Sequence, residues 1–240
     1  YAITLSCYLL YRYRSPNYLY PTLILAGISF YIYSPGQIVI ALTGVLLFFS
    51  DLRYHWQNRR MWLWAIILVG IVAIPYLRFR LKYPDAALDH LRNLGSYWLE
   101  PSPLSDKIKR YIATYGYGLS PEYWFIPNVH DFSRHLMKGY GSLLLGTLPF
   151  AALGLIVALW NIRSSAHRAV LIALLATPAG AALVDIGITR ALAFVIPATL
   201  LTGLGLSRLL EWLTDPSGWP SSFQSLSIAK WLEKNTMRYP

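Results

Sequence analysis

Long apolar runs separated by short, arginine-rich junctions are the feature that most limits what this chain can fold into. A helix rises about 1.5 Å per residue, so about 17 to 25 apolar residues cross a lipid bilayer. Several runs approach or reach that length. Only 13% of the 240 residues are charged, whereas soluble domains carry about a quarter. The sequence therefore predicts an all-α integral membrane protein, a polytopic bundle of transmembrane helices.

Seven candidate spans can be located by their apolar composition. They are residues 1–11, 18–33, 37–49, 61–77, 142–160, 169–187 and 191–210. The predicted organisation is four spans in 1–77, a long loop in 78–141, three spans in 142–213 and a cytoplasmic tail or linker in 214–240. The chain begins at Tyr1 inside an apolar stretch, so we expect the first span to be truncated and the start of a longer protein to precede it.

Arginines at alternate junctions predict the orientation of the bundle. The arginines concerned are Arg12, Arg14, Arg53, Arg59, Arg60, Arg163, Arg168 and Arg208. Basic residues of short loops stay in the cytoplasm, where they meet lipid headgroups, whereas long loops are translocated largely regardless of charge. The 78–141 loop, the 33–37 turn and the 185–190 junction are therefore expected to share the extracytoplasmic face.

The long loop carries two patterns of helical periodicity. The first pattern is Leu88, Leu91, Leu94 and Trp98, and the second is Ile108, Tyr111, Ile112 and Tyr115. Lys107, Lys109 and Arg110 occupy the other face of the second helix. A basic amphipathic helix suits the membrane interface. Packing of the same helix as a lid on the bundle explains the pattern equally well.

A polar run in residues 128–138 gathers the candidate site residues His130, Asp131, Arg134, His135 and Lys138. The two histidines could ligate a metal, although no carboxylate or cysteine stands at a matching helical spacing. A His/Asp pair could act as acid and base. Arg134, His135 and Lys138 could hold a phosphate or diphosphate group, because arginine offers bidentate contacts and lysine a point charge. A solvated loop without a specific role is the remaining alternative.

Two further ionisable residues, Asp185 and Arg190, lie where the sixth span meets the seventh. Charges close to a bilayer are costly and are functional candidates, but the two could also form a mutual ion pair. Cys7 is the only cysteine, which excludes an intrachain disulfide and a cysteine metal site. The basic residues lie mostly at the ends of apolar runs, so we expect no nucleic-acid partner, and no cofactor or metal is predicted.

Three stretches of the chain resemble bacterial polytopic glycosyltransferases of the GT-C superfamily, of the family 39 or dolichyl-phosphate-mannose protein mannosyltransferase-like kind. Residues 27–37, GISFYIYSPGQ, are similar to that family's G-x-S-x-Y-S-Y-x-P turn. Residues 119–125, LSPEYWF, followed by His135 and by GYGSLLLGTLPF in 139–150, resemble its F-S-P-x-F-L-F, R-H and G-x-G-x-L passage. Residues 189–197, TRALAFVIP, resemble its H-A-L-R-A-L-x-x-x-P segment, with Thr189 about where the family often carries His.

This resemblance implies a multi-pass protein of the bacterial inner membrane that transfers a sugar from a polyprenyl-phosphate carrier to an acceptor at the extracytoplasmic face. It implies that Arg134, His135, Lys138 and Arg190 bind the donor phosphate, and that the lipid tail needs a groove between helices. The catalytic carboxylate is expected in the first outer loop, ahead of this chain, so no Asp here is assigned that role. The expected partners are membrane lipids, the polyprenyl-phosphate-linked sugar and other membrane subunits.

Two other functions compete with the transferase. The chain could be a non-catalytic membrane scaffold subunit of a larger complex. A transporter is disfavoured, because the spans contain almost no interior charge and no inverted pair of broken helices.

Overall fold

Helices make up the regular structure of the computed structural model, which describes residues 1–127, 131, 133–135 and 138–214. No strand occurs within those ranges, so the predicted all-α class is confirmed for them. Three helical stretches are long and apolar enough to cross a membrane, namely Arg59–Lys82, Ser165–Leu183 and Ile188–Thr214. These stretches indicate a membrane protein.

Each of the seven predicted segments contains a helix. The helices are α1 (Ala2–Tyr13), α2 (Leu19–Ile32), α3 (Ser34–Ser50), α5 (Arg59–Lys82), α9 (Leu148–Trp160), α10 (Ser165–Ala176) and α12 (Val195–Thr214). Helices α1, α2, α3 and α9 have 12, 14, 17 and 13 residues, fewer than the about 20 that a straight span needs. Length and composition therefore support three spans, not the seven expected.

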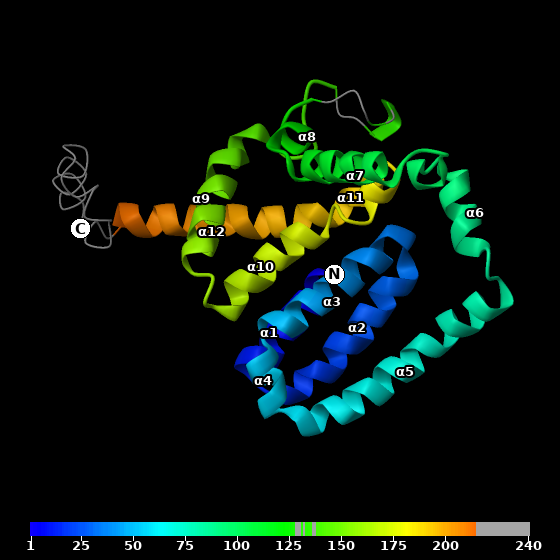
Figure 1. The fold of residues 1–240 in the computed structure, drawn as a ribbon. Helices are drawn as coiled ribbons and strands as arrows, with labels where there is room; N and C mark the ends of the chain where they lie inside the picture. The colour runs from blue at the N-terminus through cyan, green and yellow to red at the C-terminus, as the bar shows by residue number, and fades with distance from the viewer. Residues whose placement is uncertain (128–130, 132, 136–137, 215–240) are drawn as a thin grey trace.

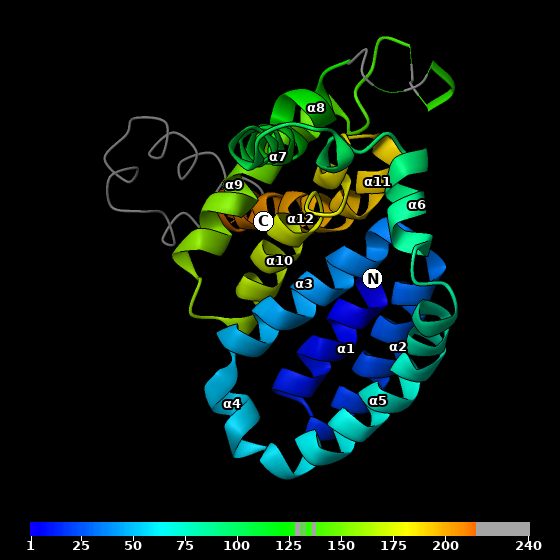
Figure 2. The same ribbon diagram turned by 45° about the vertical axis from the view of Figure 1, so that its right-hand side comes forward.

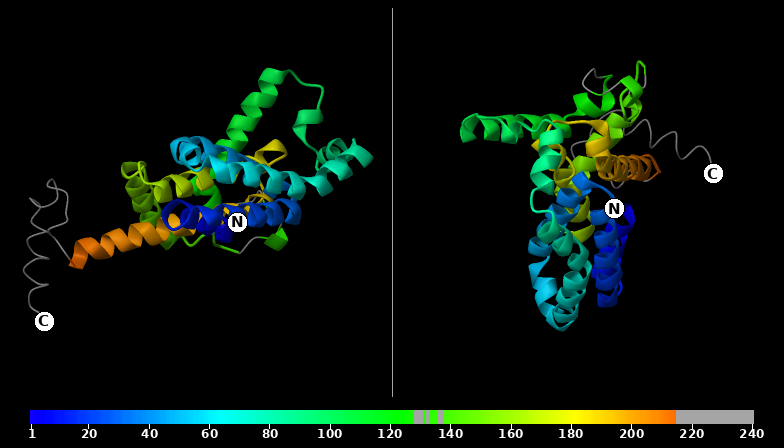
Figure 3. Two further views of the ribbon diagram at one scale, coloured as in Figure 1. Left: turned by 90° about the horizontal axis from the view of Figure 1, so that it is seen from below. Right: turned by 90° about the vertical axis from the view of Figure 1, so that its right-hand side faces the viewer.

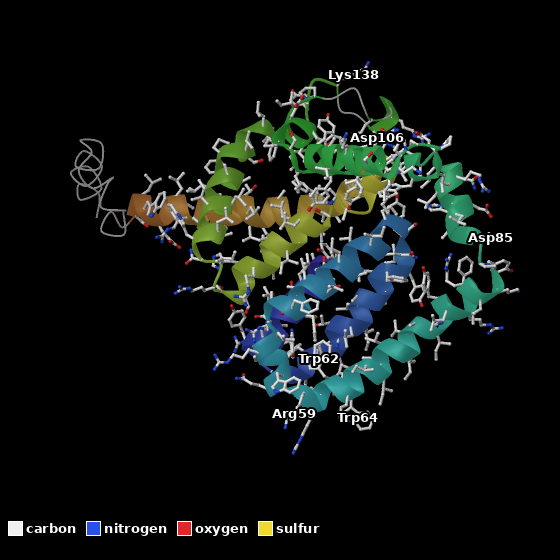
Figure 4. The ribbon with its side chains drawn as sticks, in the orientation of Figure 1. Arg59, Trp62, Trp64, Asp85, Asp106 and Lys138 are labelled. Atoms are coloured by element: carbon white, nitrogen blue, oxygen red, sulfur yellow. The ribbon has the colours of Figure 1, made fainter. Side chains whose placement is uncertain are left out.

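Helices α1, α2, α3 and α5 run side by side, and α10 packs against α3 (Figures 1 and 2). Their shared core contains Leu5, Tyr8, Tyr11, Leu19, Leu47, Ala65, Ala169 and Ala173. Helix α5 forms the outer edge of this group and buries very little of its surface. Figure 4 shows Trp62 turned towards the neighbouring helices and Trp64 pointing away from them. A helix that exposes so much apolar surface is suited to lipid.

Pro75 lies inside α5 and removes one backbone donor from its hydrogen-bond ladder. Tyr31 of α2 enters the ladder beside this proline: its hydroxyl donates to the Val72 oxygen at 2.7 Å and accepts from the Tyr76 nitrogen at 3.1 Å. The Tyr31 hydroxyl therefore fastens α5 to α2.

Helices α9 and α12 cross in close backbone contact (Figure 1). Gly154 of α9 lies against the Leu201 oxygen, and Gly205 of α12 lies against the Phe150 oxygen, so that a Cβ atom at either glycine would overlap the other helix. Small residues permit such an approach in membrane helices. The contact fixes α12, which forms one wall of the site described below.

The long loop contains α6 (Ala86–Asn93), a 3-10 turn at Tyr97–Leu99, α7 (Leu104–Leu119) and α8 (Pro121–Phe125). The prediction that one helical pattern extends from Leu88 to Trp98 was wrong, because Gly95 takes the left-handed φ of 66° and ends the helix. The second predicted helix is confirmed and is longer than expected. Figure 3 shows α7 projecting sideways from the bundle, across the direction of α5.

Only part of the apolar surface of α7 is covered by the protein. Tyr111 and Tyr115 face the chain after α10, where their hydroxyls donate to the Ala179 oxygen at 3.3 Å and to the Leu175 oxygen at 2.6 Å. The adjoining apolar residues are exposed, and they are Leu104, Ile108 and Ile112. The apolar face therefore contacts the bundle along one side and stays uncovered along the other.

Candidate functional site

A cavity of about 450 Å³ lies where the α2–α3 turn meets the start of α12. It is lined by Tyr1, Ser29, Ile32, Tyr33, Gly36, Val39, Ile40, Thr189, Arg190, Leu192, Ala193, Val195 and Ile196. The lining is mostly apolar, and the cation is supplied by Arg190, in the short helix α11 (Ile188–Ala191). The sequence predicted that the 33–37 turn and Arg190 share one face, and the structure brings them to one cavity.

A second and larger groove, of about 580 Å³, lies next to this cavity along α12. Val195 and Ile196 line both spaces, so the two adjoin each other at the start of α12. The walls of the larger groove are Ala2, Leu5, Ser6 and Leu9 of α1, Ala166, His167, Ala169 and Val170 of α10, and Thr199, Leu200 and Leu204 of α12. The two adjoining spaces, together called the channel, are mostly apolar, and the Arg190 guanidinium lines the smaller of them.

Arg190 keeps most of its hydrogen-bonding capacity. Its Nη1 donates to the backbone oxygen of Asp185 at 3.3 Å, and a guanidinium has five N–H donors. The alternative prediction, an ion pair between these two side chains, was wrong. The Asp185 carboxylate is exposed and accepts from the backbone nitrogen of Ile186 at 2.8 Å.

Asp131 ties the long loop to the chain beside Arg190. Its buried carboxylate accepts from the Ile188 nitrogen at 2.7 Å and from the Tyr123 hydroxyl at 3.0 Å. Burial and the neighbouring Asp131 carboxylate raise the pKa of Tyr123 well above its ordinary value, so the phenol stays protonated and donates. Asp131 is therefore an anchor that holds the long loop at Ile188, two residues before Arg190.

The predicted loop cations do not line the cavity itself. Arg134 and His135 are neighbours in a 3-10 turn, where Arg134 Nε and His135 Nε2 are 3.3 Å apart. The exposed Lys138 points away from the helices (Figure 4). His130 lies outside the described residues. Within the described part of the chain, no group of three or more His, Cys, Asp or Glu residues could hold a metal ion.

A second cluster of charged residues, which the sequence did not predict, lies at the other end of α1. We call Arg12, Asp51, Ser165 and Arg168 the clamp. Arg12 Nε lies 3.0 Å from Asp51 Oδ2, and Arg168 pairs with Asp51 Oδ1. The Ser165 hydroxyl donates to the same Oδ1 at 3.1 Å and accepts from Arg12 Nη2 at 2.8 Å. Asp51 itself is only 5% exposed.

One signal in the sequence could have revealed the clamp. Asp51 is the only acidic residue before Asp85, and it directly follows an apolar run. A lone carboxylate at the end of a membrane helix is expected to pair with a cation. Arg12 and Arg168 were instead interpreted as residues that face lipid headgroups. That interpretation was wrong for both, because they face Asp51.

The geometry suits an elongated, mostly apolar ligand that carries an anionic group at one end. Comparison with protein-family models, curated protein sequences and solved structures gives no match for this chain. The functional inference therefore rests on the residues that line the channel and on the loop that Asp131 anchors.

Proposed function

We propose that this chain is the donor-binding part of a membrane-embedded glycosyltransferase, which transfers a sugar from a polyprenyl-phosphate carrier to an acceptor at the extracytoplasmic face. The observation that carries the proposal is the pair of adjoining apolar spaces along α12, with Arg190 in the lining of the smaller one. A polyprenyl phosphate has the same two parts, an anionic head and a long hydrocarbon chain. The resemblance to GT-C transferases in residues 27–37 and 189–197 supports the same ligand, since both stretches line the cavity that contains Arg190, called the head cavity from here on.

Arg190 is the principal donor to the phosphate in this proposal. Arg134, His135 and Lys138 lie outside the cavity lining and are proposed to approach the phosphate from the loop, which Asp131 fastens at Ile188, two residues from Arg190. Charge-assisted bonds from guanidinium to phosphate are about twice as strong as neutral ones. The transferase also requires a catalytic carboxylate, which we expect in the first outer loop of the complete protein. A complete sequence with no Asp or Glu after its first span would favour a non-catalytic scaffold subunit.

The proposal includes the placement of the chain in the bacterial inner membrane as a multi-pass protein of seven spans. Helices α1, α2, α3 and α9 then cross as shorter spans, with the bilayer thinned locally or the helix ends extended by their flanking residues. Helix α7 lies in the headgroup layer, because it runs across the bundle direction and exposes Leu104, Ile108 and Ile112 beside its packed face.

Binding of undecaprenyl phosphate to the protein in lipid nanodiscs tests this function. We expect the wild type to prefer it to undecaprenol, which lacks the phosphate, and Arg190→Ala to weaken binding about tenfold, the effect of losing a hydrogen bond to a charged group. Arg110→Ala is the matched control, because Arg110 is equally cationic, lies in α7 outside the cavity lining and pairs with Glu100. Equal binding of both lipids, or an Arg190→Ala variant that binds like the wild type, would rule out the assigned phosphate site.

Sugar transfer provides the second test of the proposal. The complete protein is assayed with polyprenyl-phosphate sugar donors, and Arg134→Ala and Arg190→Ala are compared with the wild type. We expect both variants to lose most of their activity. Activity like the wild type in both would exclude these arginines from donor binding.

A further inference from the structure

The clamp joins three segments that are far apart in the chain. Asp51 follows α3, Arg12 ends α1, and Ser165 and Arg168 begin α10. Asp51 also accepts from the Tyr8 hydroxyl at 2.5 Å. Removing charges from water is costly unless they are paired and hydrogen-bonded, and here Asp51 has a donor at each oxygen. The cluster is therefore a specific joint between α1, α3 and α10.

The clamp directly adjoins the walls of the larger groove. Ser165 precedes the lining residue Ala166, and Arg12 follows the lining residue Leu9 by three positions, which is nearly one helical turn. Tyr1, at the start of the chain, lines the head cavity with Arg190. The groove thus extends between the clamp at one end and Arg190 at the other.

Small side chains are part of the groove lining on both helices, Ala2 and Ser6 on α1 and Ala166 and Ala169 on α10. Leu5 of α1 packs in one core cluster with Ala169 and Ala173 of α10, but within lipid the hydrophobic effect does not drive helices together. The polar joint at Asp51 adds ion pairs and hydrogen bonds that link α1 to α10 at this end of the groove.

We propose that the clamp is a positioning device, which holds α1 against α10 so that the groove along α12 stays open for the hydrocarbon chain of the lipid ligand. This inference rests on the proposed function and extends it to residues remote from the phosphate. Arg12, Asp51, Ser165 and Arg168 are positioning residues and do not touch the headgroup. They affect binding of the ligand's hydrocarbon tail, whereas Arg190 affects binding of its phosphate.

Lipids with hydrocarbon tails of different length distinguish the role of the clamp from the role of Arg190. Undecaprenyl phosphate needs the head cavity and the groove, whereas geranyl phosphate, with a much shorter chain, fits the head cavity. We expect Ser165→Ala and Arg12→Lys to weaken binding of undecaprenyl phosphate about fivefold and to leave geranyl phosphate unchanged. Ser165→Thr, which keeps the hydroxyl, should restore the affinity for the long chain. Equal loss for both lipids, or no loss for either, would overturn the inference.

A distance measurement keeps the inference testable without any ligand. Spin labels at Ser6→Cys and Leu200→Cys, introduced with Cys7→Ser, report the width of the groove by pulsed electron paramagnetic resonance. We expect one narrow distance in the otherwise unchanged protein, and a broadened or shifted distance when Ser165→Ala is added. An identical distribution would contradict the role of the clamp. A changed distribution in a protein that binds neither lipid would support the clamp and refute the proposed function.

Discussion

Tyr31 and Val72 are joined by a 2.7 Å hydrogen bond that places a side-chain hydroxyl of α2 in the backbone ladder of α5. The same hydroxyl accepts from the nitrogen of Tyr76, the residue that would bond to Val72 in an uninterrupted helix. Pro75 stands beside this position. Because α5 buries little other surface, this contact is an important part of its attachment to the bundle.

Replacing Tyr31 by Phe removes the hydroxyl and retains the ring. We expect Tyr31→Phe to lower the free energy of unfolding by about 1 kcal/mol, the usual net value of one hydrogen bond. The loss should be smaller in a Pro75→Ala background, where the helix can close its own ladder. A double-mutant cycle of thermal unfolding in nanodiscs measures the coupling, and strictly additive effects would show that the proline and the hydroxyl are independent.

Removing the charge of Asp51 should destabilise the protein strongly. Asp51→Asn leaves two partly buried guanidiniums without their carboxylate, and we expect a loss of about 3 kcal/mol. Asp89→Asn is the matched control, because Asp89 pairs with Arg92 on the surface and such pairs contribute about 1 kcal/mol or less. Denaturant unfolding of both variants gives the comparison. Similar losses in the two would mean that burial of the clamp adds no stability.

The clamp should also make stability depend on acidity. Burial alone would raise the pKa of Asp51, but the Tyr8 hydroxyl and the two guanidiniums hold it below its ordinary value of 3.8. A carboxyl whose pKa is lowered by folding contributes stability above its unfolded-state pKa and loses it as the pH falls through the folded-state pKa. The unfolding temperature should therefore fall below about pH 4. In Asp51→Asn the unfolding temperature should decline less steeply with falling pH. A decline like that of the wild type would exclude Asp51 as the source of the pH dependence.

The contact between α9 and α12 should not tolerate a side chain at Gly205. Gly205→Ala would place a methyl group against the Phe150 oxygen and force the helices apart, at a cost of about 1–3 kcal/mol. Gly203→Ala is the control, because a Cβ atom there has nothing within 4 Å. Unfolding temperatures of the two variants should differ clearly. Equal temperatures would mean that the helices can separate at little cost.

Lipid contact by α7 can be tested with single cysteines in a Cys7→Ser background. Spin labels at Ile112→Cys and Ala113→Cys occupy neighbouring exposed positions, but only Ile112 belongs to the apolar face. We expect the label at 112 to be more accessible to oxygen than to a water-soluble nickel complex, and the label at 113 to show the reverse. Access of the nickel complex to both positions would place α7 in water. A label at 112 that neither reagent reaches would indicate a covering protein.

Local patterns predicted the helices well, whereas contacts between distant residues were not predictable. The apolar run in 61–77 indicated α5, and the spacing of Ile108, Tyr111 and Ile112 indicated α7, since periodicity is a property of neighbouring residues. The end of α6 was not predicted, because a single glycine such as Gly95 does not indicate from sequence alone that its φ is positive. The Ser34-Pro35-Gly36 turn and Arg190 were placed on one face by charge alternation alone.

The clamp could not be predicted by the same reasoning. Asp51 and Ser165 are 114 positions apart, and counting arginines by junction treats each of them as independent of the others. The contacts of Asp51 depend on how the helices pack. The candidate site shows the same limit, because the sequence named Arg190 but gave no indication that α1, α10 and α12 form a groove beside it.

The clamp residues are far apart in the sequence, and this separation determines the order in which the clamp forms during synthesis. Arg12 and Asp51 emerge from the ribosome first, and Ser165 and Arg168 follow more than a hundred residues after Asp51. During that interval Asp51 has Arg12 as its only cationic partner in the clamp, and the joint stays incomplete. Synthesis of α10 supplies the second guanidinium, that of Arg168, so the clamp end of the groove reaches its final form only after α10 has been made. A nascent chain stalled before residue 165 is therefore an assembly intermediate that lacks the α10 and α12 walls of the groove.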